Sequence, residues 1–353
     1  MEATRSIIVG TGLIVLDVTI DAECGEVMRL SAGGTCGNVL CVLARLGWFA
    51  VPICTLGRDK AGDLLKEDLL NSGVALTLVH QSDHVTTSVV INRIHTSGDR
   101  PHHEFLLHCP HCDALIFRFT PVTSGYVPSA VLQPFLPLSC FFADRLSPAS
   151  VSLAKEARNT GALVVFEPSV VDTTDLFKEM VEYSHVVKYS YDRLLAPLLL
   201  MEWSHPILEI QTLGAAGLRY RLHAFSSQTY EWCFLPSPKA SVIVDSSGAG
   251  DWCTAGIIHI LSAKMAAGRE FSDMAAEIEH GLTFGQALAA WSCRYVGARG
   301  AMCATTKAQM WADLATLLDV YRPQAKPFII QSPSLKDLLP IICPNCAGQA
   351  PSF

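Results

Sequence analysis

Strand-like apolar segments alternate with helix-like segments along much of the chain, and this alternation limits the folds open to it. The strand-like segments are 6–10, 49–57, 139–146, 162–168, 185–190 and 206–214, and the helix-like segments are 37–46, 60–73, 148–161 and 176–183. Parallel strands are joined by crossovers that are usually helical, so this order predicts an α/β fold in which helices cover both faces of a mostly parallel sheet. Gly73 and Gly161 stand where glycine commonly ends a helix.

Two regions interrupt this alternation and predict a smaller, separate sheet. Residues 12–32 and 83–119 contain segments in which apolar and polar residues alternate, such as 86–94 and 103–109. Such a pattern is typical of half-exposed antiparallel strands. Beyond residue 256 the sequence favours helices, at 256–268, 282–297 and 307–321, and the segment after residue 322 is rich in proline.

Composition and charge exclude several classes of protein. Half of the 353 residues are hydrophobic and 17% are charged, which supports a large buried core. The net charge is −7 and there is no block of Lys and Arg, which argues against a nucleic-acid binder. The longest apolar region, 39–57, contains Arg45, Gly47 and Pro52 and so predicts no membrane helix. The N-terminus lacks the basic region of a signal peptide, so we expect a soluble, cytoplasmic protein without a membrane partner.

The segment VDSSGAGDWCTAG (244–256) places Gly248, Ala249 and Gly250 directly before Asp251 and a helix-like run. The first backbone N–H groups of a helix lack partners and carry partial positive charge, and small residues let an anion approach them. These residues therefore predict an anion hole for a phosphate or a developing phosphoryl charge. A carboxylate beside a phosphate suits a general base that takes a proton from an attacking hydroxyl group. The alternative is a tight turn followed by an acidic residue in the first helical turn.

Residues 245–251, DSSGAGD, resemble the DTxGAGD signature of the ribokinase-like (PfkB) carbohydrate kinases. Other segments resemble that family's motifs in the family's order, namely GGTCGN (33–38), ARLG (44–47), GRDKAG (57–62), TLGAAG (212–217) and VGARGA (296–301). The chain is thereby identified as a member of the family over roughly residues 6–320. The resemblance implies a ribokinase-like fold, with a central mostly parallel sheet flanked by helices and a small β-sheet lid over the active site.

The resemblance also implies an activity and a domain layout. The activity is ATP-dependent phosphorylation of a hydroxyl group on a sugar or nucleoside-like small molecule. Residues 1–322 would form the kinase domain, with lid strands within about 12–32 and 83–119, and residues 323–353 would form a proline-rich tail. The family resemblance allows a homodimer through the lid. The alternative function is a catalytically silent sugar- or nucleotide-binding regulator, but such a protein has no need of a base at Asp251.

By the same resemblance, the site residues fall into three groups. Asp251 is the catalytic base, and the backbone amides from Ser247 to Gly250, which include those of Gly248 and Ala249, neutralise charge on the transferred group. The residues that match the acceptor-binding positions are Asp17, Gly33, Gly34 and Asn38. The residues that match the nucleotide side are Thr212, Gly214, Gly217, Lys188 and Gly297. An exposed acid at a strand end is the alternative for Asp17, and a plain turn is the alternative for the glycine pair.

The chain departs from the family at the positions that organise Mg²⁺. The family's N-x-x-E pattern aligns with KYSYDRL (188–194), which puts Ser190 and Arg193 in place of the asparagine and the glutamate. A cation cannot hold Mg²⁺, so Arg193 either faces a phosphate directly or lies on the surface in a shifted alignment. Glu167 could recover part of the metal role, and ATP and Mg²⁺ remain the expected cofactors. Trp252, beside the base, either narrows the acceptor pocket or packs in the core.

Two C-P-x-C pairs, CPHC (109–112) and CPNC (343–346), predict a structural Zn²⁺ site. Four thiolates from two such turns suit tetrahedral Zn²⁺, which would pin the C-terminal tail across the base of the lid. The predicted ligands are Cys109, Cys112, Cys343 and Cys346. The alternatives are unrelated free pairs, a redox dithiol in a redox-sensing protein, zinc shared between chains, and replacement of a cysteine by His108 or His111. The histidines near the first pair, including His103, are otherwise expected to be solvated or to face the acceptor.

Overall fold

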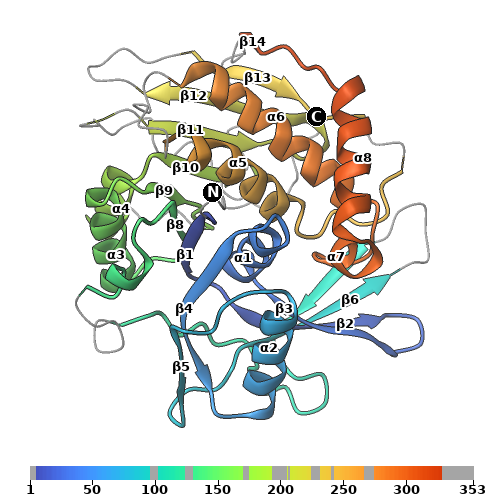
Figure 1. Cartoon of the computed structure of the whole chain (residues 1–353). Helices are drawn as coiled ribbons and strands as arrows, with labels where there is room; N and C mark the ends of the chain where they lie inside the picture. The colour runs from blue at the N-terminus through green and yellow to red at the C-terminus, as the bar shows by residue number, and fades with distance from the viewer. Residues whose placement is uncertain are drawn as a thin grey trace, which may run out of the picture.

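The fold is built around a larger and a smaller sheet, which Figure 1 shows with their helices. The computed structural model describes residues 5–95, 102–123, 130–169, 175–192, 205, 207–223, 231–239, 242–265 and 274–327. Within these ranges, no helix combines the length and the apolar character that crossing a membrane requires.

The larger sheet confirms the predicted α/β architecture. Its strands within the described residues are, in spatial order, β14 (Lys326–Pro327), β13 (Cys233–Pro236), β12 (Gly217–His223), β11 (Ile207–Thr212), β10 (Val186–Ser190), β9 (Leu163–Phe166), β8 (Cys140–Ala143), β1 (Ile7–Thr11), β4 (Phe49–Gly57) and β5 (Val79–Ser82). The strands from β11 to β5 in this order run parallel. The sequence did not predict β12, β13 and β14, which extend the sheet in antiparallel fashion at one edge.

Helices cover both faces of the larger sheet, as predicted. One face carries α3 (Pro148–Asn159) and α4 (Asp175–Tyr183), and the other carries α1 (Thr35–Arg45), α5 (Ala249–Met265), α6 (Ala275–Ser292) and α8 (Lys307–Val320). Successive strand residues alternate between the two cores, so Val164 packs on the α3 side and Val165 on the α5 side. Because both faces are covered, the central strands β8 and β9 are apolar throughout.

Local sequence signals set the ends of two helices. Ser147 and Ser150 form a capping box at the start of α3, in which each side chain accepts the backbone N–H of the other, at 3.1 and 2.8 Å. Gly73 follows the last turn of α2 (Lys60–Asn71), and Gly161 follows α3. Their φ angles are +84° and +81°, which confirms the prediction that these glycines end the two helices.

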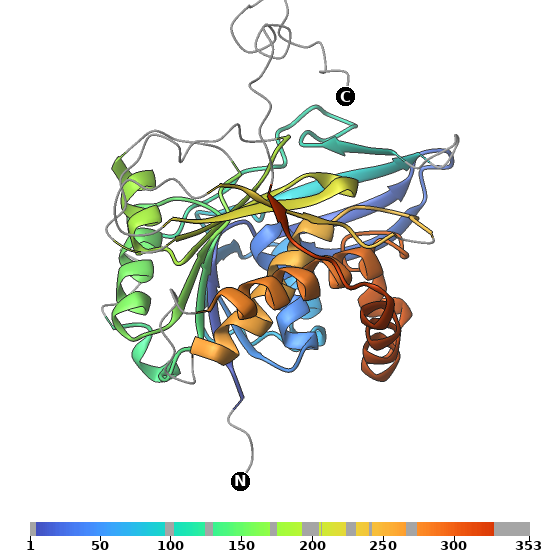
Figure 2. The same cartoon turned by 90° about the horizontal axis from the view of Figure 1, so that it is seen from above.

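The smaller sheet, which we call the lid, lies where the sequence predicted it. Its strands within the described residues are, in spatial order, β3 (Val27–Gly33), β2 (Val15–Asp21), β6 (Val89–His95) and β7 (His102–Leu106). The β2–β3 and β6–β7 pairs are antiparallel, as expected, whereas β2 and β6 run parallel. After β3 the chain leaves the lid and forms α1, β4, α2 and β5 of the core. It then returns to the lid as β6, which runs in the same direction as β2. Figure 2 shows the lid strands, in blue and teal, extending beyond the main sheet.

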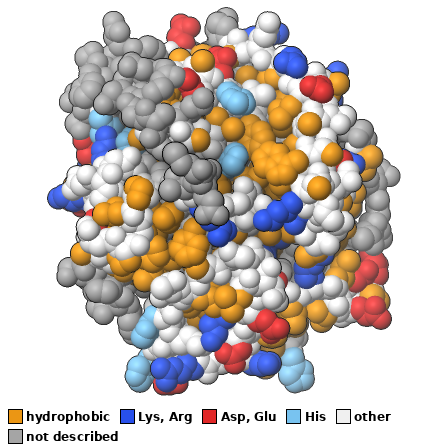
Figure 3. Space-filling view, in the orientation of Figure 1, with side chains coloured by type: hydrophobic (Ala, Val, Ile, Leu, Met, Phe, Trp, Pro, Cys, Tyr) orange, Lys and Arg blue, Asp and Glu red, His pale blue; other side chains and the backbone are white. Residues whose placement is uncertain are grey.

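Two expectations from the sequence concern the surface of the protein: it should not bind nucleic acid, and it could form a homodimer through the lid. On the face shown in Figure 3, the Lys and Arg side chains of the described residues are scattered and form no single patch. On the lid, Val27, Met28 and Leu30 of β3 expose apolar side chains. The homodimer through the lid stays a prediction. So does the boundary at residue 322, because residues 328–353 lie outside the described ranges.

Candidate active site

The loop before α5 has a backbone conformation that requires a small residue. Gly248 has a φ of +72°, and a Cβ atom there would lie 2.8 Å from the Cα atom of Ala298. The glycine therefore lets segment 245–251 pack directly against the loop that precedes α7 (Gly300–Ala304). Trp252 is fully buried, donates to the Ala298 carbonyl at 2.8 Å and packs edge-on against Trp291. Of the two expectations for Trp252, the structure supports packing in the core.

Two of the amides that the sequence assigned to the anion hole already have acceptors within the protein. The Ser247 amide donates to Oδ1 of Asp245 at 2.7 Å, and the Ala249 amide donates to a carbonyl in its own turn at 3.2 Å. The amides of Gly248 and Gly250 have no hydrogen-bond acceptor among the described residues. The candidate anion hole is therefore narrower than the sequence predicted, because the segment itself uses part of its donor set.

Asp251 lies in the first turn of α5 and meets the acceptor motif on α1. The Asn38 side chain donates from Nδ2 to Oδ2 of Asp251 at 2.7 Å. Burial raises the pKa of Asp251 to about 7, and the charge of Glu167 adds to the rise, while Asn38 and the ammonium group of Lys188 oppose it. A carboxyl group with a pKa near neutrality suits general base catalysis. The structure thus brings the predicted base together with one predicted acceptor residue.

The glycine pair of the acceptor motif packs closely against Asp17 and Leu13. A Cβ atom on Gly33 would lie 1.9 Å from Oδ2 of Asp17, and one on Gly34, whose φ is +78°, would lie 2.4 Å from the carbonyl oxygen of Leu13. Burial raises the pKa of Asp17 to about 7, although Arg299 acts in the opposite direction. Asp17 is therefore a half-buried residue in the middle of β2, not an exposed acid at a strand end. The glycines are required by close packing as well as by the turn.

A third carboxyl group, Asp144, is absent from the residues that the sequence predicts. It follows β8, accepts the Leu13 amide at 2.8 Å and pairs with Arg145. The residue is 1% exposed, and burial raises the pKa of its carboxyl to about 7. A small pocket nearby is lined by residues that include Gly12, Thr55, Ser88, Arg118 and Phe119. The signal in the sequence is an acid at the carboxyl end of a parallel strand, where α/β folds commonly bind ligands.

Glu167 and Lys188 form a buried ion pair beside the start of α5. The Lys188 ammonium group lies 2.7 Å from Oε1 of Glu167 and 3.2 Å from the carbonyl oxygen of Gly250, to which it also donates. Thr254 donates to the other carboxylate oxygen of Glu167. Burial alone would lower the pKa of Lys188, but the Glu167 carboxylate raises it above its usual value. The pair therefore fixes the position of the Gly250 carbonyl and holds Lys188 charged.

These contacts bear on the expected magnesium site. Both oxygens of Glu167 are engaged by protein donors, so Glu167 does not offer the free carboxylate that the sequence expected of it. Arg193 lies outside the described residues, and Ser190 ends β10 without an acidic neighbour on that strand. In the part of the chain that the structure describes, no group of three or more His, Cys, Asp or Glu side chains is placed to hold a metal ion. Of the residues proposed for the magnesium side, the described ones, Glu167 and Ser190, thus offer no carboxylate that is free of protein donors.

The residues predicted for the nucleotide side lie in two loops besides β10. Thr212 ends β11, and the turn Gly214–Ala216 leads to Gly217, which opens β12. Gly214 and Gly217 have φ angles of +57° and +125°, so both use backbone conformations that favour glycine. The Gly297 amide donates to Oδ2 of Asp245 at 2.6 Å. Gly297 is therefore tied directly to segment 245–251.

The first cysteine pair forms a tight turn beyond β7. The Cys109 amide donates to the carbonyl of Ala114 at 2.8 Å, and the Asp113 amide donates back to the carbonyl of Cys109 at 2.9 Å. Asp113 has a φ of +58°, which closes the turn. Hydrogen bonds from the backbone of His111 and Cys112 lower the pKa of the Cys109 thiol, because they stabilise its thiolate form.

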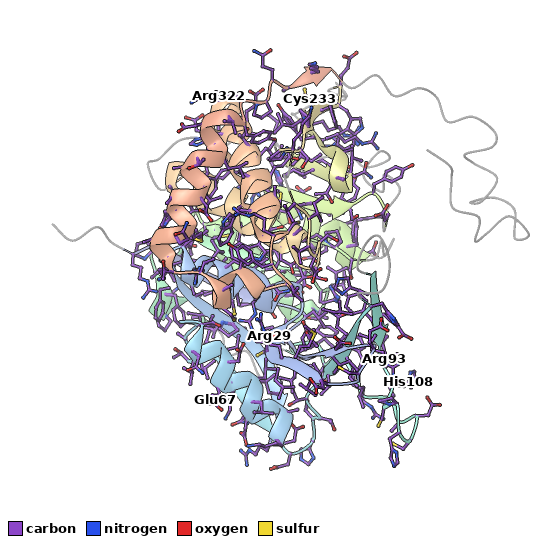
Figure 4. The ribbon with its side chains drawn as sticks, turned by 90° about the vertical axis from the view of Figure 1, so that its right-hand side faces the viewer. Arg29, Glu67, Arg93, His108, Cys233 and Arg322 are labelled. Atoms are coloured by element: carbon purple, nitrogen blue, oxygen red, sulfur yellow. The ribbon has the colours of Figure 1, made fainter. Side chains whose placement is uncertain are left out.

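The structure describes only two of the four predicted zinc ligands. Cys109 and Cys112 carry free thiols, whereas Cys343 and Cys346 lie outside the described residues. Figure 4 shows His108 at the outer edge of the molecule, near the lid strand that carries Arg93. The predicted zinc ligands therefore stay a prediction.

Comparison with solved structures shows the same fold. The aminoimidazole riboside kinase of Salmonella enterica, complexed with aminoimidazole riboside and an ATP analogue, has a TM-score of 0.62 and 20% identity over 88% of this chain and 100% of that one. The fructokinase of Xylella fastidiosa with bound ATP has a TM-score of 0.65 and 18% identity over 89% of this chain and 98% of that one. The fructokinase of Vibrio cholerae, bound to fructose, ADP and calcium ion, has a TM-score of 0.63 and 20% identity over 88% and 100%.

Sequence comparison identifies the family. The aminoimidazole riboside kinase of Salmonella typhimurium is 27% identical over 248 residues, which cover 65% of this chain and 73% of that protein. The sequence profile of the pfkB family of carbohydrate kinases matches residues 9–196, more than half of the chain. The motif order, the ribokinase-like fold and this match agree, and the chain belongs to the pfkB family of carbohydrate kinases.

Proposed function

We propose that this sugar kinase transfers the γ-phosphoryl group of ATP to a hydroxyl group of a sugar or nucleoside-like acceptor, with Asp251 as the general base. The observation that carries the proposal is the 2.7 Å hydrogen bond between Asn38 and Asp251. It joins the end of the acceptor motif to an acid at the N-terminus of α5, beside two amides without acceptors among the described residues. An acceptor hydroxyl placed there would meet a base and an anion hole together.

The proposed chemistry uses a few groups of the chain in defined roles. Asp251, whose pKa is about 7, takes the proton of the attacking hydroxyl group. The amides of Gly248 and Gly250 and the α5 dipole stabilise charge on the transferred phosphoryl group. Lys188 donates to the Gly250 carbonyl at 3.2 Å and so fixes the peptide that joins Gly250 to Asp251. Asp17 supplies a carboxyl group that can accept hydrogen bonds from other acceptor hydroxyls.

The names of the relatives suggest which acceptors to test first. They include a kinase of aminoimidazole riboside and fructokinases, so a riboside and a free sugar are both reasonable probes. The small pocket beside Asp144 is lined by Thr55, Ser88 and Phe119, among others, and its acceptor role is for the panel to decide.

The test is a transfer assay with ATP and a panel of D-fructose, D-ribose and aminoimidazole riboside. We expect one of them to yield a phosphorylated product that mass spectrometry detects, and Asp251→Asn to yield almost none. ATP binding to that variant, measured by calorimetry, should match the unmodified protein. Product formation by Asp251→Asn at the unmodified rate would overturn the assignment of the base.

A catalytically silent binder is the second candidate, and the altered magnesium side favours it. Ser190 stands in place of the expected asparagine, and Glu167 is held by Lys188 and Thr254. This candidate predicts tight binding of ATP or an acceptor without transfer to any panel member. Retention of a half-buried carboxyl with a pKa near 7 beside the anion hole argues for the enzyme.

We also propose that Cys109 and Cys112 supply half of a structural Zn²⁺ site, with Cys343 and Cys346 as the other half. The turn around Cys109 supports this, because its backbone hydrogen bonds favour the thiolate that Zn²⁺ requires. The purified protein should carry about one zinc per chain, with Zn–S distances near ~2.3 Å.

Chelation of that zinc should lower the Tm, because metal binding adds to folding stability when the unfolded chain lacks the site. Cys343→Ser should lose the metal, whereas Cys293→Ser, which changes a half-buried thiol in another part of the chain, should keep it. A metal-free protein of unchanged Tm would overturn the zinc proposal and leave the kinase proposal intact.

A further inference from the structure

A histidine of the lid reaches the loop that carries the anion hole. His103 lies on β7, and its Nε2 atom is 2.8 Å from Oδ1 of Asp245 and 3.3 Å from the hydroxyl oxygen of Ser247. The side chains of His103 and Asp245 are 14% and 1% exposed, so solvent screens their interaction little. The contact joins the lid to the first residue of segment 245–251.

Asp245 organises two parts of the proposed active site. Its Oδ1 atom accepts the Ser247 amide at 2.7 Å, and its Oδ2 atom accepts the Gly297 amide at 2.6 Å. Ser247 leads into the glycines of the anion hole, and Gly297 belongs to the loop predicted to face the nucleotide. A shift of the Asp245 carboxylate would therefore move both loops together.

The ring of His103 is fixed from the lid side as well. Its Nδ1 atom lies 3.0 Å from Oδ1 of Asn92 on β6, and the ring stacks on Phe105 at 6.1 Å between centroids. Oxygen atoms of Asn92 and Asp245 thus face the two ring nitrogens. A rotation of the ring away from Asp245 would also break its contact with Asn92.

We infer that His103 is a positioning residue that fastens the lid to Asp245, so that lid closure and ordering of the anion hole occur together. This inference rests on the proposed function, because it concerns the same anion hole. Asp17 is on β2, which pairs with β6, and β6 pairs with β7. An acceptor bound at Asp17 would therefore stabilise the lid position in which His103 meets Asp245, and Asp245 in turn holds the Ser247 and Gly297 amides.

The primary test is amide hydrogen exchange, which needs no acceptor. His103→Phe keeps an aromatic ring against Phe105 but removes both nitrogen atoms. We expect amides in 245–251 and 295–299 to exchange about tenfold faster in this variant, the change expected when one hydrogen bond is lost. His103→Gln keeps one donor for Asp245 and should recover most of the protection. His95→Gln is the matched control, because His95 contacts Glu104 on the same sheet at 3.5 Å and should leave both segments unchanged.

The kinetic test separates a positioning role from a structural one. With the panel acceptor that the kinase phosphorylates, His103→Phe should lower kcat by about 10–10²-fold, because small misplacements of reacting groups are costly. The KM for ATP should change little, and His103→Gln should restore most of kcat. Unchanged exchange in 245–251 would overturn the inference, and so would an equal increase over α3 and α4, which would indicate general destabilisation. If instead Asp251→Asn keeps full turnover, the proposed function fails, while the exchange result still decides the role of His103.

Discussion

Segment 245–251 begins and ends with an aspartate, and the structure places the two in opposite environments. Asp245 pairs with His103 and accepts the amides of Ser247 and Gly297, and although burial opposes them, these interactions lower its pKa. Asp251 has a neutral partner in the Asn38 side chain, and burial raises its pKa to about 7. One carboxylate is held ionised and fixes loops, whereas the other can exchange a proton near neutral pH. The role of each follows from its partners and not from its membership of the motif.

The largest expected effect is the difference in kcat between Asp251→Asn and Asp245→Asn. Loss of a general base costs about 10²–10⁴-fold in rate, so Asp251→Asn should lose nearly all turnover. Asp245→Asn keeps an acceptor oxygen for the Ser247 amide, so its kcat should fall less and its Tm should fall more. Steady-state kinetics and thermal melts of both variants measure this. Equal losses of kcat would remove the distinction between the two aspartates.

The acceptor side should respond through KM. Asp17→Ala and Asn38→Ala each remove a hydrogen-bonding group, which we expect to cost about 1–3 kcal/mol of acceptor binding. The KM for the acceptor should therefore rise far more than the KM for ATP. Initial rates at varied concentrations of each substrate provide the measurement. An equal rise for both substrates would place the two residues outside the acceptor site.

The pH dependence of kcat/KM sharpens the assignment of Asp251. A base works in its ionised form, so with a pKa of about 7 the rate should fall as the pH drops below 7. The Asn38 amide stabilises the carboxylate, so Asn38→Ala should shift this acid limb to higher pH. A pH profile of the unmodified protein and the variant tests both statements. An acid limb that stays near pH 4 would show that the base ionises as in water.

The smallest expected effect is on stability. A carboxyl group with a raised pKa binds its proton more tightly in the folded state, so its contribution to stability falls as the pH rises from about 4 to about 7. Asp251→Asn cannot ionise, and above pH 7 its Tm should exceed that of the unmodified protein by several °C. The difference should vanish near pH 4. A variant that melts lower at pH 8 would indicate that the Asp251 carboxylate stabilises the fold.

The sequence predicted most of the strands and helices of the core, and it predicted Asp251 as the base. It did not predict contacts between residues that lie far apart in the chain. Apolar runs and helix ends are local signals, so strands such as β4 and the glycine after α2 were predicted correctly. The parallel pairing of β2 with β6 depends on where the chain returns, which no local pattern encodes. Strand β12 is held by pairing with β11, and β13 by pairing with β12, so their own residues signal them weakly.

In the candidate active site, too, the sequence predicted the local features and missed the contacts between distant residues. The small residues before an acid predicted the anion-binding loop and the base Asp251, because that pattern is contained in consecutive residues of the chain. The contact of His103 with Asp245 and the place of Asp144 beside Leu13 depend on tertiary packing. The opposite pKa shifts of Asp251 and Asp245 also follow from their partners in the folded structure, and these partners cannot be read from a seven-residue motif.

The pairing of β2 with β6 has a consequence for the order in which the protein folds. α1, β4, α2 and β5 all lie between these strands in the chain, so the strands meet only by closing a long loop. Loop closure costs conformational entropy, and contacts between distant residues form slowly. We therefore expect the core to condense before the lid is complete, so that the kinase gains its acceptor-binding surface in the final folding step.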